Sequence, residues 1–149
     1  MGVMASRALT MDYTYAVTPF IAWLVAGSLK FLINSAKAGQ WAFGHIGYGG
    51  MPSNHSAIVS STATLIALKE GIQSPAFGVA LTVAFIVIMD ANSLRREIGK
   101  HAETINRFAF SDDHKATSTL RERIGHSKLE ITAGIFVGVM VGQVLNIFP

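Results

Sequence analysis

The chain has 149 residues, of which 50% are hydrophobic and only 14% are charged. This length suits a single domain, residues 1–149, and the composition lies on the membrane side of the soluble range. The net charge of +3 is modest, and the lack of cysteine excludes disulfides and thiolate chemistry. Residues 1–17 lack the pattern of a cleaved signal peptide, in which a charged stretch precedes an apolar one and small residues.

Four apolar segments follow one another along the chain, at residues 13–29, 56–68, 74–89 and 129–148. A helix needs about 20 apolar residues, within a range of about 17–25, to span a bilayer. The first and last segments meet this length, the third meets it with its flanks, and the second is marginal. The second could instead be a buried helix of a soluble protein, but four such segments leave little polar exterior. The sequence therefore predicts an all-α, membrane-embedded bundle of about four transmembrane helices.

Short and long connections join these segments. Residues 69–73 form a tight hairpin in which Gly71 ends one helix and Pro75 starts the next. Residues 90–128 are highly charged, and within them we expect residues 90–108 to form a cytoplasmic helical extension. Residues 111–118, SDDHKATS, are typical of a flexible loop.

Alternating spans would bring the unusual polar residues to one face of the membrane. Four spans place the ends of the first and third helices beside the starts of the second and fourth. Random placement would scatter these residues, and ionisable residues at such positions indicate a functional site. The residues that converge are Lys30, Ser53, His55, Asp90, Arg95, Arg96, His126 and Glu130.

The sharpest pattern is a histidine and a glutamate four residues apart at the start of the last segment. His126 and Glu130 share one helix face, which Gly134, Gly138 and Gly142 continue. The carboxylate can hold one ring N–H and leave the other nitrogen free as a nucleophile or base. The glycines admit a closely packed neighbouring helix. The alternative is a helix-end ion pair with a packing stripe, but a second histidine and several cations at this end favour a site.

The stretch GGMPSNHSA, residues 49–57, indicates an oxyanion site beside a helix start. Gly49 and Gly50 offer unobstructed backbone N–H groups, and His55 could either serve an anion or cap the helix. Cations near two helix N-termini favour a multiply charged oxyanion, most simply phosphate. No cluster indicates a metal, and we expect no cofactor. The cations are Lys30, Lys37, Arg95 and Arg96; of the other histidines, His101 and His114 are expected at the surface and His45 in loop packing.

Three stretches resemble the divergent bacterial and plant branch of the type 2 phosphatidic acid phosphatase superfamily, which also includes vanadium-dependent haloperoxidases. The resemblance spans about residues 20–145, nearly the whole chain. The first stretch, GGMPSNHSA, departs from the family pattern at Asn54. The second, DANSLRREIGKHAETIN, matches it at Asp90, Ala91, Arg95, Arg96, Gly99 and Asn106. The third, GHSKLEITAG, matches it at Gly125, His126 and Glu130.

The chain departs from the wider superfamily in its phosphate-binding positions. Lys30 and Lys37 have the spacing of the first motif, but Lys37 replaces an arginine and no proline follows. In the third motif Leu120 occupies the position of an arginine, and Glu130 replaces an aspartate. We expect Arg95 or Arg96 to supply the missing charge.

The resemblance implies a two-step mechanism without metal. His126 attacks phosphorus and forms a phosphohistidine, and Glu130 orients His126 and balances its charge. His55 protonates the leaving oxygen and then activates water. The resemblance and the charges together assign phosphate binding to Lys30, Lys37, Gly50, Ser53, Arg95 and Arg96, with Asp90 and Asn54 as further candidates.

The sequence thus predicts a membrane phosphatase that hydrolyses a phosphate monoester or diphosphate of a lipid, of polyprenyl or glycerolipid type. One alternative is a non-catalytic membrane protein of the same fold that binds phosphorylated lipid. A second is a vanadate-dependent oxidase, which the small size and the membrane embedding disfavour. The expected partners are the lipid substrate, the membrane and a second copy in a homodimer, with no nucleic acid.

The basic residues predict the orientation in the cell membrane. Of the 12 lysines and arginines, 10 lie on or beside the site face, and only Arg7 and Lys69 lie opposite. The positive-inside rule therefore places the site in the cytoplasm and both termini outside.

Overall fold

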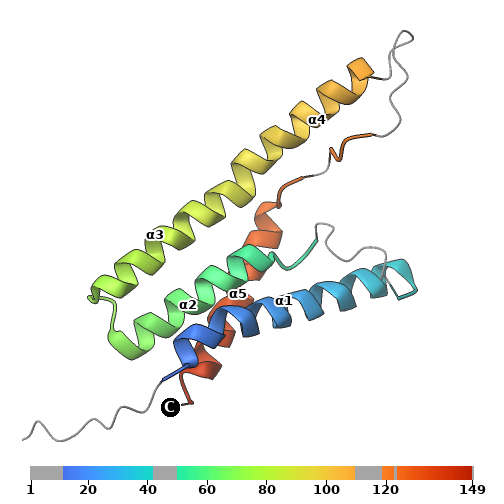
Figure 1. Cartoon of the computed structure of the whole chain (residues 1–149). Helices are drawn as coiled ribbons and strands as arrows, with labels where there is room; N and C mark the ends of the chain where they lie inside the picture. The colour runs from blue at the N-terminus through green and yellow to red at the C-terminus, as the bar shows by residue number, and fades with distance from the viewer. Residues whose placement is uncertain (1–11, 42–49, 110–118, 123, 149) are drawn as a thin grey trace, which may run out of the picture.

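The computed structural model describes residues 12–41, 50–109, 119–122 and 124–148, and these residues form helices and connecting segments without a strand. The predicted all-α class is confirmed. The elements in chain order are α1 (Thr14–Ala38), α2 (Asn54–Glu70), α3 (Pro75–Met89), the π-helical turn η2 (Asp90–Leu94), α4 (Arg95–Ala109) and α5 (Lys128–Leu145) (Figure 1).

The short connection between α2 and α3 follows from three residues. Gly71 has a φ of +85°, which lets the chain leave α2 at a conformation that other residues rarely adopt. The Ser74 hydroxyl then accepts a hydrogen bond from the Phe77 N–H at 3.1 Å and caps α3. Pro75 occupies the first turn of α3, where a missing N–H costs nothing. The predicted hairpin is confirmed.

Helix α2 is the centre of the bundle and packs against α1, α3 and α5 (Figure 1). The α5 glycines make its closest contact possible. A Cβ on Gly142 would lie 2.7 Å from the Ser61 carbonyl oxygen, and one on Gly138 would lie 3.0 Å from the Ala57 Cα. Any side chain on this stripe would push α5 away from α2, as the glycine pattern predicts.

Three helices are long and apolar enough to cross a membrane: α1, the continuous helix Pro75–Ala109, and α5. Large apolar side chains such as Phe20, Phe85 and Phe136 are exposed on them, which suits contact with lipid. Helix α2 has 17 residues and is not among the three. The membrane-embedded helical class is thus supported, with three spans by length and composition where the sequence predicts about four.

The continuous helix Pro75–Ala109 extends well beyond a bilayer core. Its 35 residues correspond to about 52 Å, against about 30 Å of hydrocarbon, so α4 continues α3 outward (Figure 1). Its inner face packs on the chain that leads into α5. Asn106 Nδ2 donates to the Leu120 carbonyl at 2.8 Å, and Gly99 lies against the Glu122 backbone. The predicted helical extension is confirmed.

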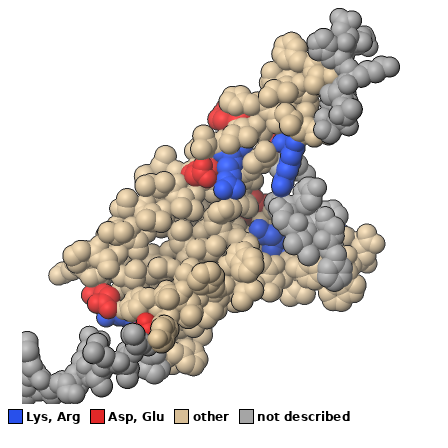
Figure 2. Space-filling view, in the orientation of Figure 1, with Lys and Arg blue, Asp and Glu red and all other residues tan. Residues whose placement is uncertain are grey.

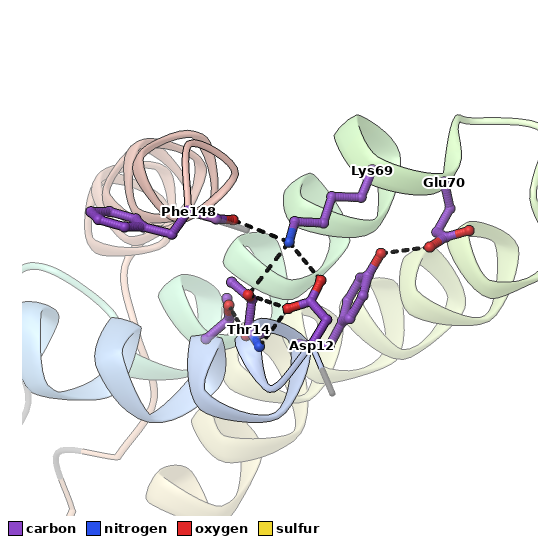
Figure 3. A network of polar contacts seen from close by, with 7 residues as sticks. Asp12, Thr14, Lys69, Glu70 and Phe148 are labelled. Atoms are coloured by element: carbon purple, nitrogen blue, oxygen red, sulfur yellow. Dashed lines mark hydrogen bonds and ion pairs between the residues drawn. The ribbon is translucent and has the colours of Figure 1, made fainter. Parts of the chain in front are cut away.

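A polar network joins helix ends at the other end of the bundle (Figure 3). Lys69 at the end of α2 forms an ion pair with Asp12 at 2.7 Å and donates to the Phe148 carbonyl at 3.3 Å. The hydrogen bonds from Lys69 and Thr14 lower the pKa of Asp12 to about 2. On the face shown in Figure 2, an uncharged surface separates this network from the charges near the α3–α4 junction, as expected for a protein that spans a membrane.

Candidate active site

His55 and His126 face each other where three elements meet. Their ring centroids lie 5.8 Å apart and their planes are inclined by 57°. His55 belongs to the first turn of α2, and His126 precedes α5 by two residues. The His126 backbone N–H donates to the Ala91 carbonyl in η2 at 2.9 Å, which holds this histidine against the third element. The structure therefore brings together two histidines that are 71 residues apart in the sequence.

Glu130 fixes the orientation of the His126 ring. One of its carboxylate oxygens accepts from His126 Nδ1 at 3.2 Å and from the Ser127 N–H at 2.9 Å. The Ser127 hydroxyl accepts from the Glu130 N–H at 3.3 Å, which completes a capping box at the start of α5. Because a carboxylate only accepts hydrogen bonds, Nδ1 carries the proton and Nε2 of neutral His126 keeps its lone pair.

The surroundings of His126 favour its neutral form. The side chain is nearly buried, and this burial lowers the pKa of His126 below its usual value. The hydrogen bond to Glu130 raises this pKa in part, while the positive charges of Lys30 and Arg95 lower it further. A neutral imidazole with a free Nε2 can act as a nucleophile or as a base.

Arg95 connects His55 to η2. Its Nε donates to Asp90 Oδ2 at 3.2 Å, and its NH2 group lies 3.3 Å from His55 Nε2. Both arginine contacts are part-buried. Asp90 is the first residue of the π-helical turn and Arg95 directly follows it, and such turns occur often at functional sites.

The side chain of the neighbouring Arg96 lies against Gly125. This side chain is exposed, and the φ of Gly125 is +102°. A Cβ on Gly125 would lie 3.0 Å from the Arg96 Cγ, so the close approach and the backbone conformation both call for glycine. Of the two arginines that the sequence leaves open, the structure brings Arg95 to the histidines.

The two lysines of α1 lie at different depths. Lys30 is half-buried, and its charge acts on Glu130, His55 and His126. Lys37 is exposed and lies about 10 Å further along the axis, because α1 stays helical through Ala38. The structure thus groups Lys30 with the histidines and places Lys37 nearer the end of the helix.

In the predicted phosphate site at the start of α2, Ser53 serves as the N-cap of the helix. Ser53 is fully buried, and its hydroxyl caps α2 by accepting from the Ser56 N–H at 3.3 Å. Ser53 therefore caps this helix, and His55 follows in its first turn with the ring towards His126. Asn54 Oδ1 is buried and has no hydrogen-bond partner among the described residues.

Gly50 lies against a residue of α1 that the sequence analysis did not single out. Its φ is +136°, and a Cβ there would lie 3.2 Å from Asn34 Oδ1. Asn34 follows Lys30 by one helical turn and therefore lies on the same face of α1. Its spacing from Lys30 is the only signal in the sequence, and it is a weak one.

The remaining predicted positions lie away from the cluster or outside the described residues. His101 is exposed on α4, and Leu120 is 49% exposed, with its backbone N–H bonded to Asn106 Oδ1 at 2.8 Å. The positions outside the described residues are His45, Gly49, His114 and the predicted loop 111–118.

Comparisons with known proteins identify the family of the chain. A family model described as the divergent PAP2 family matches residues 11–141. The chain is also similar to the uncharacterized membrane protein YuiD of Bacillus subtilis (strain 168), with 32% identity over 114 residues. That match covers 67% of this chain and 72% of the relative. No solved structure is significantly similar to the chain.

Proposed function

The chain belongs to the divergent PAP2 family, and on this basis we propose that it is a metal-independent phosphatase acting on lipid phosphates in the membrane. One observation carries the proposal above all others. His126 presents a free Nε2 because Glu130 holds its Nδ1, and His55 faces it at a centroid distance of 5.8 Å. A phosphorus atom placed between the rings would have a nucleophile on one side and a proton donor on the other.

In the first step, His126 Nε2 attacks phosphorus in line with the leaving oxygen. The N–P bond forms, the P–O bond to the lipid breaks, and His55 gives its proton to the departing oxygen. The substituted ring of His126 is then positively charged, and Glu130 balances that charge through the Nδ1 contact at 3.2 Å. The products of this step are the lipid alcohol, or the lipid monophosphate from a diphosphate, and a phosphohistidine.

In the second step, water replaces the lipid. Neutral His55 takes a proton from the water, whose oxygen attacks phosphorus as the N–P bond breaks. Inorganic phosphate leaves and His126 recovers its lone pair. The same histidine thus acts first as acid and then as base, which restores both rings after one turnover.

Cations and N–H groups stabilise the oxygens of the reacting phosphoryl group. We assign this role first to Lys30 and Arg95, since these two surround the histidines, and to the N-terminus of α2. Gly50 and Asn54 are the further phosphate-binding candidates at this helix start. Ser53 acts indirectly, because it caps α2 and so fixes where the helix begins. Lys37 and Arg96 remain candidates for the outer rim because both are exposed.

The substrate is proposed to be an amphiphile whose phosphate sits at headgroup depth. The histidines lie near the junction of α3 and α4, where the apolar helix gives way to a charged one. We propose four spans, with α2 enclosed by the other three, and a site on the cytoplasmic side according to the distribution of basic residues. A phosphate monoester or diphosphate of a polyprenyl or glycerolipid fits this position.

The test is phosphate release from a panel of lipid phosphates in detergent micelles, with and without chelator. We expect release that survives chelation and is lost in His126→Ala. The matched control is His101→Ala, because His101 is exposed on α4 and away from the site. Activity that disappears in chelator and returns with a divalent ion would contradict the mechanism, as would full activity of His126→Ala.

A second function is favoured by one contact. Arg95 occupies His55 Nε2, the atom that would have to carry the transferred proton. A protein that only binds phosphorylated lipid could keep this arrangement. Saturable binding of a lipid phosphate without phosphate release, and without a trapped phosphohistidine, would support this alternative over catalysis.

A further inference from the structure

The contact between Arg95 and His55 defines the protonation of the histidine. A guanidinium carries only N–H donors and stays protonated in proteins. At 3.3 Å from the Arg95 NH2 group, His55 Nε2 must therefore be the acceptor and hold a lone pair. The ring of His55 then carries its single proton on Nδ1.

With its only proton on Nδ1, the His55 ring cannot donate a proton from Nε2. Nδ1 of His55 is buried and has no hydrogen-bond partner among the described residues, so it is poorly placed to deliver a proton to a ligand. Nε2 is the ring nitrogen with a partner, and it is occupied by Arg95. His55 can thus serve as an acid only after Arg95 leaves Nε2.

Arg95 can leave His55 Nε2 and still stay bound to Asp90. Asp90 binds Nε of Arg95 at 3.2 Å, whereas His55 is bound by the NH2 group. An incoming oxyanion would need to replace only the second contact. Both Asp90 and Arg95 are more than a third exposed, so their ion pair contributes little to stability by itself.

Each element around His55 contributes a charged or titratable group. Lys30 comes from α1, His126 from the segment before α5, and Asp90 and Arg95 from the region of η2. Lys30 and Arg95 place positive charge beside the ring of His55, and the carboxylate of Asp90 opposes them in part. An oxyanion among them reverses the local balance and favours the imidazolium.

We propose that Arg95 is a positioning residue that holds His55 neutral, with its proton on Nδ1, until a phosphate oxygen replaces Nε2 as the acceptor of the guanidinium. Nε2 then takes up one proton, from water or from a monoanionic phosphate, and His55 becomes the acid of the first step. Asp90 keeps Arg95 at the site throughout. The acid role of His55 rests on the proposed function, whereas the exchange of acceptors does not.

The experiment is NMR of ¹⁵N-histidine-labelled protein in detergent micelles, with signals assigned through single histidine substitutions. Without ligand, we expect His55 Nε2 in the shift range of an unprotonated nitrogen and Nδ1 in that of a protonated one. Inorganic phosphate should move both nitrogens to the protonated range. Arg95→Gln should lose the fixed tautomer and protonate His55 at higher pH in the absence of phosphate.

Two matched variants separate this role from a structural one. Arg107→Gln removes an exposed arginine further along α4 that has no role at the site, and it should reproduce the wild-type signals of His55. Arg95→Lys keeps a cationic donor and should retain the Nδ1–H tautomer. The melting temperature of each variant shows whether it is folded under the conditions of the measurement.

The readout requires no turnover, so it is independent of the phosphatase assay. A ligand-free His55 with its proton on Nε2, or an unchanged His55 signal in folded Arg95→Gln, would overturn the control by Arg95. A His55 that stays neutral when phosphate is bound would overturn the exchange. Absence of phosphate release together with the expected tautomer and exchange would refute catalysis and leave this inference intact.

Discussion

The Ser53 N–H donates to the Glu130 carbonyl oxygen at 2.8 Å, and this bond joins the start of α2 to the start of α5. Each of the two residues also makes a side-chain contact that helps to position one of the histidines. Ser53 caps the helix that carries His55, and the Glu130 carboxylate holds the ring of His126. A change in the spacing of α2 and α5 must therefore alter the distance between the two histidines.

Gly134→Ala should disturb this junction. A Cβ at residue 134 would lie 2.9 Å from the Ser56 Cβ and would also meet the backbone of Ser53. We expect a loss of about 1–3 kcal/mol in the free energy of unfolding, as for other overpacked sites, together with a strong loss of activity. Thermal unfolding in detergent and phosphate release measure the two effects.

The matched control is Gly78→Ala on α3, where an added Cβ meets nothing within 4 Å. This substitution should be neutral or stabilise the helix by about 0.5–1 kcal/mol, because alanine favours a helix over glycine. A folded and fully active Gly134→Ala would contradict the view that this packing sets the site.

The roles of the two histidines can be separated by trapping the intermediate. His126→Ala should abolish phosphohistidine formation because it removes the nucleophile. His55→Ala should slow turnover by about 10²–10⁴-fold, the usual contribution of general acid–base catalysis. The loss of rate in the first step should be smaller for an ester whose leaving group has a low pKa, because that group can depart without a proton from His55. Rapid-quench labelling of each variant is the measurement, and a label trapped on His55 would reverse the assignment.

The local patterns in the sequence were sufficient to predict much of this arrangement. The hairpin at Gly71 and Pro75, the His126–Glu130 contact and the glycine face of α5 depend on residues at most a few turns apart. Backbone geometry alone relates such residues, so their spacing predicts their contacts. These features are the ones that the structure bears out.

The choice between Arg95 and Arg96 could not be predicted in this way. The π-helical turn η2 shifts the register of the helix, and an ideal α-helical pattern does not contain that shift. The capping role of Ser53 depends on where α2 begins, which spacing defines only loosely. Asn34 lies against Gly50 through a tertiary approach, and a local pattern cannot reveal such an approach.

The pH dependence of catalysis should reflect the environment of His126. Burial lowers the pKa of His126, and the nucleophile must be neutral, so kcat/KM should persist below the ordinary histidine pKa of about 6.5. The hydrogen bond to Glu130 opposes this shift because it stabilises the imidazolium. Glu130→Gln should therefore move the acidic limb to lower pH while it reduces kcat.

The profiles are compared on one lipid phosphate, so the ionisation of the substrate contributes equally to both enzymes. The control is Glu103→Gln, since Glu103 is exposed on α4 and pairs with Arg107 at 2.5 Å. An acidic limb that moves to higher pH in Glu130→Gln would show that the carboxylate does not stabilise protonated His126.

The orientation in the membrane can be tested because the native chain has no cysteine. Thr104→Cys on α4 and Gln73→Cys in the α2–α3 connection place single thiols at exposed positions toward opposite ends of the continuous helix. The distribution of basic residues predicts a cytoplasmic α4. An impermeant thiol reagent applied to intact cells should then label Gln73→Cys and spare Thr104→Cys, and both should react after lysis. Labelling of Thr104→Cys alone would invert the orientation, and equal labelling of both in intact cells would indicate insertion in two directions, as in an antiparallel homodimer.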